Sequence, residues 1–415
     1  MTSTHIRPTT SDLAGPVVID GVPARQVCRP DAPQQVADIL RQASGDGESV
    51  FPVGSGLHQS LGRIPESVDL VVSTRGLAGL IRYDPEDLVV SVRAGTTLAD
   101  LQAELASNGQ WLPVEAPGGS DATIGGMLAL GLTGPRQLGS LSLRDLLLGM
   151  VVAQTDGTLA RSGGMVVKNV TGFDMGRLHV GARGTLGVIT SANFKVLPKP
   201  ETEATIIVSF GDAVPALSEA FAAFGRIRAG ILRPVAAEVI VGDGQIRLAV
   251  RFEGRAGSVQ RQLLAARDVT GGDLETLTDP EAGRQWWECH VTGLGFDDPR
   301  ETVLRFDTRP RSIADAAGQV LEAVRRQAIP SARLVSSPGL GQLWLHLGEA
   351  PPEPVLALVA DLRRLPGAVT VLSAPTAWKA NLDPRPSDDA RPVDAALREQ
   401  FDPNGILNRG RFPLG

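Results

Sequence analysis

Apolar residues near the start of the chain recur at the spacing of an amphipathic helix. Pro33 suits the first turn of such a helix, and Asp31 is the expected N-cap. The apolar positions that then share one helical face are Val36, Ile39, Leu40 and Ala43. We therefore predict a helix whose apolar side packs against a sheet.

Short apolar runs follow this helix and predict buried strands at 49–53, 70–73 and 88–92. A second helix is expected after Thr97, because Asp100 stands three residues later in the arrangement of a capping box. Strands and helices therefore alternate in the first 110 or so residues, which is typical of an α+β or α/β opening.

The pattern changes between residues 116 and 196, where short strands alternate with glycine-rich loops. Strands are predicted at 147–154, 158–161 and 187–196. The run Leu197-Pro198-Lys199-Pro200 ends this part of the chain and marks a domain boundary.

In the second half, the order strand, helix, strand, strand, helix occurs twice, at 205–267 and at 302–364. The copies are offset by ~100 residues, the size of a domain half. The closest local echo is between residues 244–248 and 341–345. We predict two βαββα units that form one antiparallel sheet covered by helices; chance similarity is the alternative.

Composition limits the class of protein. With 42% hydrophobic residues among 415 the chain can bury a large core, and a formal net charge of −6 argues against nucleic-acid binding. Cys28 and Cys289 are far apart, which gives no disulfide framework and favours a reducing cytoplasm. Residues 1–11 are polar, and the apolar run 146–153 is too short to span a bilayer. We expect a cytoplasmic protein with at most peripheral membrane contact, at the inner face of the cell membrane.

Two glycine-rich loops carry the strongest chemical signal. The loop 52–62 follows a buried strand and has glycines at the spacing G-x-G-x(5)-G, which lets backbone N–H groups point into one concavity. An ordinary turn is the alternative for this loop taken alone. The loop 117–126 can bring small residues against a flat or anionic ligand, and Arg136 stands close enough in sequence to reach a phosphate.

Four segments together resemble a known family of flavin-binding domains. They are the two glycine loops, the stretch 132–145, and the stretch 163–190 with its motifs Val167-Lys168-Asn169-Val170-Thr171-Gly172-Phe173-Asp174 and Gly184-Thr185-Leu186-Gly187-Val188. In this order they resemble the PCMH-type FAD-binding domain of the vanillyl-alcohol-oxidase superfamily. With the C-terminal run Phe401-Asp402-Pro403-Asn404-Gly405-Ile406-Leu407-Asn408, they resemble more closely the smaller FAD-binding subunit of bacterial glycolate oxidases.

The resemblance covers residues 30–200 and the C-terminal run, and it implies an α+β fold. A two-subdomain FAD-binding domain would span 1–200, an antiparallel-sheet cap with helices on one face 201–380, and a tail that returns to the FAD domain 381–415. The cofactor would be FAD. Covalent members of the superfamily place a histidine directly after a Gly-Gly pair, whereas here Leu57 precedes His58, so we expect noncovalent FAD.

The resemblance also implies which residues contact FAD. The first loop would hold the pyrophosphate, the second the isoalloxazine and ribityl chain, and Asn408 would lie near the flavin. The predicted contacts are Val53, Gly54, Ser55, Gly56, Leu57, His58, Pro117, Gly118, Asp121, Ala122, Thr123, Ile124, Gly125, Gly126, Gly134, Pro135, Arg136, Gly184, Val188, Ile189 and Asn408.

Candidates for catalysis are fewer. Lys168 could place positive charge near the flavin pyrimidine, with an exposed surface lysine as the alternative. His290, beside Trp286 and Trp287, is the acid–base candidate, with ordinary packing against the tryptophans as the alternative. The five histidines show no metal-ligand spacing, so no metal site is predicted.

Three functions remain open at this point. The leading hypothesis is an FAD-binding subunit of a complex that oxidises glycolate or D-lactate. Its partners would be a larger FAD subunit and an iron–sulfur subunit. The second is a self-sufficient FAD-dependent 2-hydroxyacid dehydrogenase, and the third a structural subunit with a vestigial flavin site.

Overall fold

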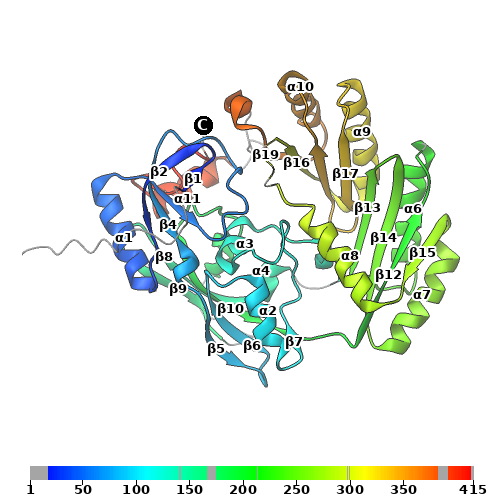
Figure 1. Cartoon of the computed structure of the whole chain (residues 1–415), viewed down its shortest axis with the longest axis horizontal. Helices are drawn as coiled ribbons and strands as arrows, with labels where there is room; N and C mark the ends of the chain where they lie inside the picture. Colours follow the sequence, from blue (N-terminus) through cyan, green and yellow to red (C-terminus); the bar gives the residue numbers. More distant parts are fainter. Residues whose placement is uncertain are drawn as a thin grey trace, which may run out of the picture.

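The computed structural model describes residues 17–139, 142–165, 174–212, 214–296, 298, 300–381 and 391–412. Figure 1 shows two bodies side by side, one built from the first 200 residues and one from the large sheet and helices that follow. The predicted α+β class with an antiparallel cap sheet is confirmed.

The first subdomain is a small sheet with strand order β1-β2-β4-β3, in which β2, β4 and β3 run parallel. The helix α1 packs its buried face, centred on Val36 and Leu40, against this sheet. The expected N-cap was wrong: Ala32 caps α1, because Pro33 takes the first helical position and leaves the residue before it as the cap. The element bounds are β1 (Val18–Ile19), β2 (Val22–Cys28), α1 (Pro33–Asp46), β3 (Val50–Val53) and β4 (Val68–Ser73).

The second subdomain is an antiparallel sheet with strand order β5-β6-β10-β8-β9. The helices α2 and α3 cover one face of it, and Leu101 of α2 shares a core with Val92 and Phe194 of the sheet. The predicted cap of the second helix is confirmed, since Thr97 accepts a hydrogen bond from the Asp100 N–H at 3.0 Å. The bounds are β5 (Leu80–Asp84), β6 (Val89–Arg93), α2 (Leu98–Ala106), β7 (Gln110–Trp111), α3 (Ile124–Leu130), α4 (Leu143–Leu146), β8 (Leu147–Ala153), β9 (Leu159–Gly163), α5 (Gly176–His179), β10 (Val188–Lys195) and β11 (Leu197–Pro198).

The second body is an eight-stranded antiparallel sheet with the order β15-β12-β14-β13-β17-β18-β16-β19. Each half has the order strand, helix, strand, strand, helix, strand, so each contains one strand more than the sequence pattern predicts. The extra strands, β15 and β19, are the two edges of the sheet, and β15 is polar and partly exposed along its length. The bounds are β12 (Thr202–Ser209), α6 (Val214–Ala229), β13 (Ala236–Gly242), β14 (Gln245–Gly254), α7 (Ala256–Thr270), β15 (Asp273–Leu277), α8 (Pro280–Thr292), β16 (Thr302–Asp307), α9 (Ile313–Arg326), β17 (Ala332–Ser337), β18 (Gln342–Leu347), α10 (Pro352–Leu362) and β19 (Ala368–Ser373).

The two faces of this sheet differ. Helices α6, α7, α9 and α10 cover one face and bury its alternate apolar residues (Figure 1). The other face is turned toward the first body, carries α8, and places Trp344 in a core with Leu61 and Phe412 of the first body and tail. Its remaining positions include charged residues such as Arg251 and Glu238, so the interface between the bodies is partly ionic.

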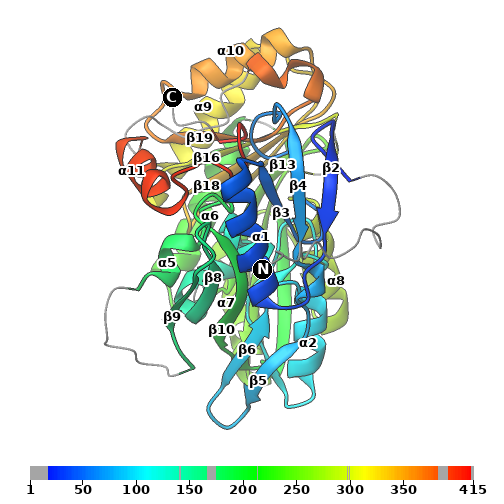
Figure 2. The same ribbon diagram turned by 90° about the vertical axis from the view of Figure 1, so that its left-hand side faces the viewer.

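The tail returns to the first subdomain through α11 (Arg391–Phe401) and the run after it, drawn red in Figure 2. Leu407 bridges Val50 beside β3, and the Asp402 carboxylate accepts hydrogen bonds from the Ile406 and Leu407 N–H groups at 3.0 and 2.8 Å. Residues more than 350 positions apart in sequence therefore build one wall of the first body.

Candidate functional site

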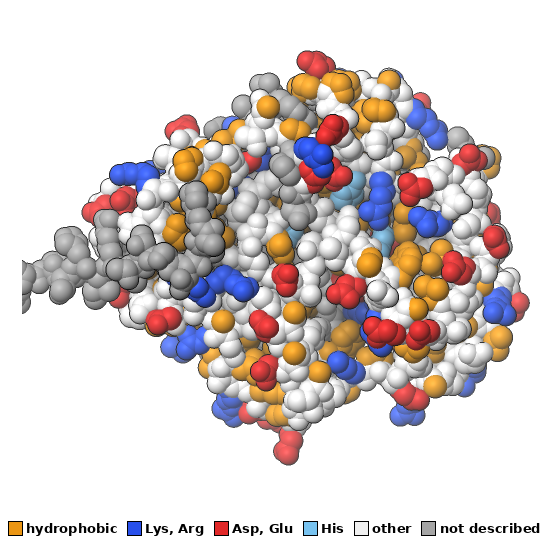
Figure 3. All heavy atoms as spheres, in the orientation of Figure 1, with side chains coloured by type: hydrophobic (Ala, Val, Ile, Leu, Met, Phe, Trp, Pro, Cys, Tyr) orange, Lys and Arg blue, Asp and Glu red, His pale blue; other side chains and the backbone are white. Residues whose placement is uncertain are grey.

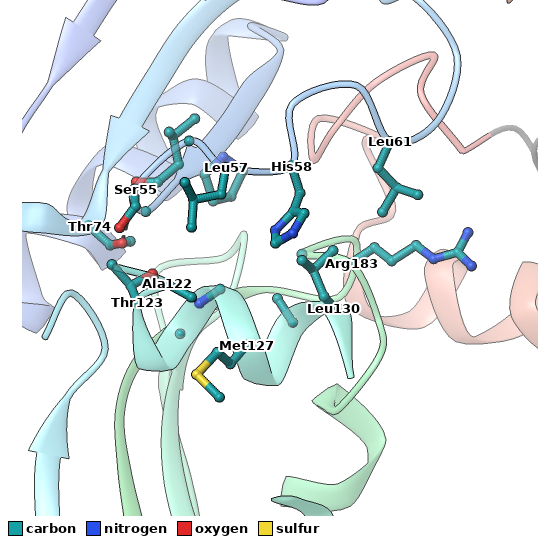
Figure 4. Close-up of a pocket in the computed structure, with 18 of the residues that line it drawn as sticks. Ser55, Leu57, His58, Leu61, Thr74, Ala122, Thr123, Met127, Leu130 and Arg183 are labelled. Atoms are coloured by element: carbon teal, nitrogen blue, oxygen red, sulfur yellow. Dashed lines mark hydrogen bonds between the residues drawn. The ribbon is translucent and has the colours of Figure 1, made fainter. Parts of the chain in front are cut away.

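A pocket lies inside the first body, near its boundary with the second, and Figure 4 shows part of its lining. Its lining comes from the loop after β3, from the loop before α3 with α3 itself, from the turn before β10, and from the tail.

The loop after β3 presents a row of backbone donors to this pocket. The backbone N–H groups of Ser55, Gly56 and Leu57 have no acceptor among the described residues. Gly56 has a φ of +78°, a left-handed conformation that favours glycine, and a Cβ there would meet nothing within 4 Å. Adjacent N–H groups held in such a turn form a concavity suited to phosphate oxygens.

The two glycine loops pack directly on each other. A Cβ at Gly54 would lie 2.1 Å from Thr123 Oγ1, so only glycine permits this contact. The Ser55 hydroxyl donates to the Asp121 carbonyl and ties the loops together from the other side. Thr123 in turn accepts a hydrogen bond from the Gly126 N–H at 3.2 Å, which holds the start of α3 in place.

Small residues make the floor of the pocket. Gly125 donates its N–H to Ala94 carbonyl at 2.8 Å, and a Cβ on Gly125 would lie 2.9 Å from the Cβ of Ala94. With Ala122 and Gly126 it forms a surface without bulky side chains, which a flat ring system can approach closely.

The inner end of the pocket is apolar and carries one imidazole. Met127, Leu130 and Leu61 surround it, and His58 points into it from the loop above (Figure 4). The His58 ring lies 4.4 Å from the ring of Phe296, which follows α8, so this end reaches the second body.

The tail and the turn before β10 complete the wall. The Asn408 side chain donates to the carbonyls of Arg183 and Gly184 at 2.9 and 3.3 Å, while its backbone N–H donates to the carbonyl of Val50 at 2.8 Å. Asn408 has a φ of +48°, a conformation that asparagine tolerates better than most residues. Gly184, Val188 and Ile189 line the pocket beside it.

The structure brings together most of the predicted contacts and leaves others outside. Those that line the pocket are Val53, Gly54, Ser55, Gly56, Leu57, His58, Pro117, Ala122, Thr123, Gly125, Gly126, Gly184, Val188, Ile189 and Asn408. Gly118, Asp121, Ile124, Gly134, Pro135 and Arg136 are absent from the lining. Gly118 packs against His58 and Gly295, and the Ile124 side chain is buried in the core of the second subdomain.

Arg136 has a different role from the one expected, because it is buried in an ionic cluster between the two bodies. Its guanidinium pairs with Glu253 on β14, and its backbone N–H donates to Glu115 at 3.0 Å. Arg251 joins the same cluster and donates to Glu203 at 2.6 Å and to Glu115 at 3.2 Å. Arg136 thus joins the bodies rather than reaching the glycine loops. Gly134 packs on Glu115 at the edge of this cluster, where a Cβ would lie 2.8 Å from the Glu115 Cβ.

His290 also lies away from the pocket lining. It is buried on α8, stacks on Trp286 with ring centroids 5.2 Å apart, and has Nδ1 3.3 Å from Arg333. Its Nε2 lies 3.8 Å from the buried carboxylate of Glu238. The packing alternative therefore describes its surroundings better than the acid–base one. Lys168 lies outside the described residues.

Sequence reasoning missed a group of pocket residues that carry no glycine signature. Thr74, Met127 and Leu130 line the pocket from neighbouring elements, and Arg183 and Arg411 bring positive charge to it. The three-residue spacing of Met127 and Leu130 on the helix after Gly126 was the available signal. Arg183 and Arg411 are close in sequence to the predicted contacts Gly184 and Asn408. No sequence pattern indicates that their side chains point into the pocket.

The loop that carries His58 is braced from three sides. The Arg411 guanidinium donates to the Gln59 and Leu61 carbonyls, the Lys379 ammonium to the Ser60 carbonyl and to Asp20, and the Ser60 hydroxyl to the Phe296 carbonyl at 2.8 Å. Burial lowers the pKa of Arg411 to about 10, and it remains a cation at neutral pH.

No group of three or more histidine, cysteine, aspartate or glutamate side chains with metal-binding geometry occurs in the described part of the chain. Within the same residues, every helix is too short or too polar to cross a bilayer.

Residues 24–163 match a family described as an FAD binding domain. The chain is 36% identical over 278 residues to glycolate oxidase subunit GlcE of Escherichia coli, an alignment that covers 66% of this chain and 73% of that protein. It is 32% identical over 184 residues to D-lactate dehydrogenase of Archaeoglobus fulgidus, covering 44% and 41% of the two chains.

Among solved structures, alkyldihydroxyacetonephosphate synthase superposes with a TM-score of 0.68 at 15% identity, over 92% of this chain and 75% of that one, which shows the shared fold. The lining described above fits FAD, because it combines N–H groups without a protein acceptor in the described part of the chain, a floor of small residues and an apolar inner end. The chain is an FAD-dependent oxidoreductase, and it belongs to the family of FAD-binding proteins that includes the glycolate oxidase subunit GlcE.

Proposed function

We propose that this chain is the FAD-binding subunit of a complex that oxidises glycolate or a related D-2-hydroxyacid. The observation that carries the proposal is the extent of the similarity to GlcE. It runs over 278 residues and so extends beyond the FAD domain. The similarity to glycolate oxidase subunit GlcD of Bacillus subtilis, at 32% identity, covers 184 residues, 39% of that protein. The partners in this proposal are a larger FAD subunit and an iron–sulfur subunit.

In this proposal FAD binds noncovalently. The N–H groups of Ser55, Gly56 and Leu57 bind the pyrophosphate, because they are charge-complementary donors without a protein acceptor. The floor at Gly125 and Gly126 supports the isoalloxazine. Bound FAD supplies the acceptor for the two electrons and the α-hydrogen of a hydroxyacid. The chain's own residues bind the cofactor, exclude water from it and hold the ring near the second body.

A self-sufficient 2-hydroxyacid dehydrogenase is the second candidate, and one observation favours it. The imidazole of His58 lines the inner end of the pocket, where a hydroxyl proton would have to be taken up. His58 therefore replaces His290 as the residue on which independent activity would depend.

The test uses the purified chain loaded with FAD, with glycolate added in the absence of oxygen. We expect the visible flavin band to stay oxidised with the lone chain. It should bleach when the larger flavin subunit of the same organism is added. Prompt bleaching of the lone chain, abolished by His58→Asn, would establish the second candidate instead. No flavin band after reconstitution would refute both.

Surface charge agrees with a small-molecule role. On the face shown in Figure 3, acidic and basic side chains are interspersed. A nucleic-acid-binding face would gather lysine and arginine along one surface.

A further inference from the structure

A second cavity lies directly beside the inner end of the flavin pocket. The two cavities share Leu61, Leu130, Leu132 and Arg183 in their linings. The second one continues from there to the cap sheet, where β16, β18 and β19 border it. A small ligand in it would therefore lie next to whatever occupies the inner end of the flavin pocket.

The lining of this cavity is cationic. Arg144, Arg183 and Arg305 contribute to it, and no carboxylate lines it among the described residues. Arg144 is exposed at the rim, whereas Arg183 and Arg305 approach from the first body and from β16. Two guanidinium groups that face one cavity repel each other unless an anion or solvent separates them.

Arg183 is the more isolated of the two. Its guanidinium lies 5.3 Å from the ring centre of Phe412 and has no hydrogen-bond acceptor among the described residues. Figure 4 shows its side chain leaving the flavin pocket past Leu130, below Leu61. Burial, with the charge of Arg305 adding to it, lowers the pKa of Arg183 to about 10, so the group stays charged at neutral pH.

Among the described residues, only the Nε of Arg305 has a protein partner, the carboxylate of Asp307. Its Nε donates to the Asp307 carboxylate at 2.8 Å, which fixes the direction of the side chain. Its terminal nitrogens have no acceptor among the described residues. Arg305 on β16 lies opposite Thr370 on the neighbouring strand β19. Thr370 also lines the cavity, and its neutral hydroxyl lies there with the two arginines.

We propose that this cavity binds the carboxylate of an organic acid beside the flavin, with Arg183 and Arg305 as its two cationic donors. The inference rests on the proposed function, since it assigns the carboxylate of a 2-hydroxyacid to this place. A guanidinium presents paired N–H donors that match a carboxylate. An anion here would neutralise Arg183 and would bind the terminal nitrogens that Arg305 does not direct at Asp307. Positioning the acid by its carboxylate leaves its α-carbon free to face the flavin ring.

Oxalate, a dicarboxylate with no hydrogen to lose, is the probe. It should perturb the visible spectrum of the FAD-loaded chain in a saturable way, and inorganic phosphate at the same concentration should not compete with it. Arg183→Gln and Arg305→Gln should each weaken oxalate binding by roughly tenfold to a hundredfold. That range matches the loss of one hydrogen bond to a charged group. Arg305→Lys should retain part of the affinity because it keeps the charge.

Arg326→Gln is the matched control, because Arg326 lies on α9 at the other face of the sheet and pairs with Asp361 at 3.0 Å. It should leave oxalate binding unchanged. Equal oxalate affinity in Arg183→Gln, Arg305→Gln and this control would overturn the proposal, as would the absence of any oxalate effect on the parent chain. Loss of FAD from Arg183→Gln with unchanged oxalate binding to the remaining holoprotein would assign Arg183 to the cofactor instead. Competition by phosphate would show a general anion site and overturn the carboxylate assignment.

The experiments distinguish failure of the carboxylate site from failure of the proposed function. Oxalate binding through the two arginines, without any partner-dependent bleaching by glycolate, would keep the site and reject the complex. Partner-dependent bleaching that survives both substitutions would keep the complex and reject the site.

Discussion

Gly54 is the position where one added methyl group separates the two glycine loops. In Gly54→Ala the new Cβ would lie 2.1 Å from Thr123 Oγ1 and 3.2 Å from both Thr123 Cβ and Cγ2. Either the loop moves away, or Thr123 rotates and gives up its hydrogen bond to the Gly126 N–H. Overpacking of this kind costs about 1–3 kcal/mol, and loss of a threonine cap alone about 1 kcal/mol.

We expect Gly54→Ala to weaken FAD binding by at least about tenfold, or 1.4 kcal/mol, because the N–H groups of Ser55, Gly56 and Leu57 move with the loop. The assay is a titration of apoprotein with FAD followed by flavin fluorescence, alongside thermal unfolding of apo and holo forms. Bound FAD adds stability according to its dissociation constant, so the holo form should lose more in melting temperature than the apo form.

Thr123→Ala provides the decisive comparison, since it removes the oxygen that Gly54→Ala would strike. In the Thr123→Ala background, the additional loss caused by Gly54→Ala should shrink by about 1–2 kcal/mol. Gly45→Ala is the matched control, because Gly45 lies in α1 with nothing within 4 Å of its position. That change should be neutral or stabilising by about 0.5–1 kcal/mol and leave FAD binding intact. Wild-type FAD affinity in Gly54→Ala, or the same loss with and without Thr123, would refute the reasoning.

Three further predictions concern the tail, the interface and pH. Arg411→Met leaves two carbonyls of the His58 loop without their donor, so FAD release measured after dilution should accelerate, whereas Arg326→Met should not change it. Arg251→Met takes one of two arginine partners from each of the buried carboxylates Glu203 and Glu253, which keep Arg284 and Arg136. Urea unfolding should therefore show a loss smaller than the about 3–5 kcal/mol of a fully unpaired buried charge, and Glu203→Gln should partly restore it; additive losses would contradict the ionic account. Burial lowers the pKa of His179 from 6.5 to about 4, so the unfolded chain binds the proton more readily between these values. Stability present above pH 6.5 should therefore fall as pH drops toward 4, by up to about 3 kcal/mol, and His179→Gln should flatten that part of the profile.

Local patterns accounted for the elements with strong periodicity. The face of α1 centred on Val36 and Leu40, the cap at Thr97 and the strand β16 appear where the sequence predicts them, because short-range packing and capping decide them. The edge strands β15 and β19 were not predicted. The sequence of β15 is polar and the strand is partly exposed, so its pattern is weak, whereas β19 is buried along most of its length and its apolar run was simply not assigned. Ala32 replaced Asp31 as a cap for an equally local reason, the demand of Pro33 for the first helical position.

The glycine loops could be located from the sequence because close backbone approach tolerates only glycine, and this requirement is local. Gly54 against Thr123 and Gly125 against Ala94 show the requirement in space. The sequence did not allow us to predict the direction in which long side chains point. Arg136 turned to Glu253, 117 residues away, and His290 to the buried carboxylate of Glu238.

The sequence by itself therefore determined most of the strands and helices, the two glycine loops that line the pocket, and the family to which the chain belongs. Tertiary structure alone decided which charged groups line the pocket. A buried guanidinium or imidazole must find a partner or a cavity in the low-dielectric interior, and that partner is chosen by the packing of distant elements. Arg183 and Arg411 reached the pocket for this reason, while Arg136 was drawn into the interface between the two bodies.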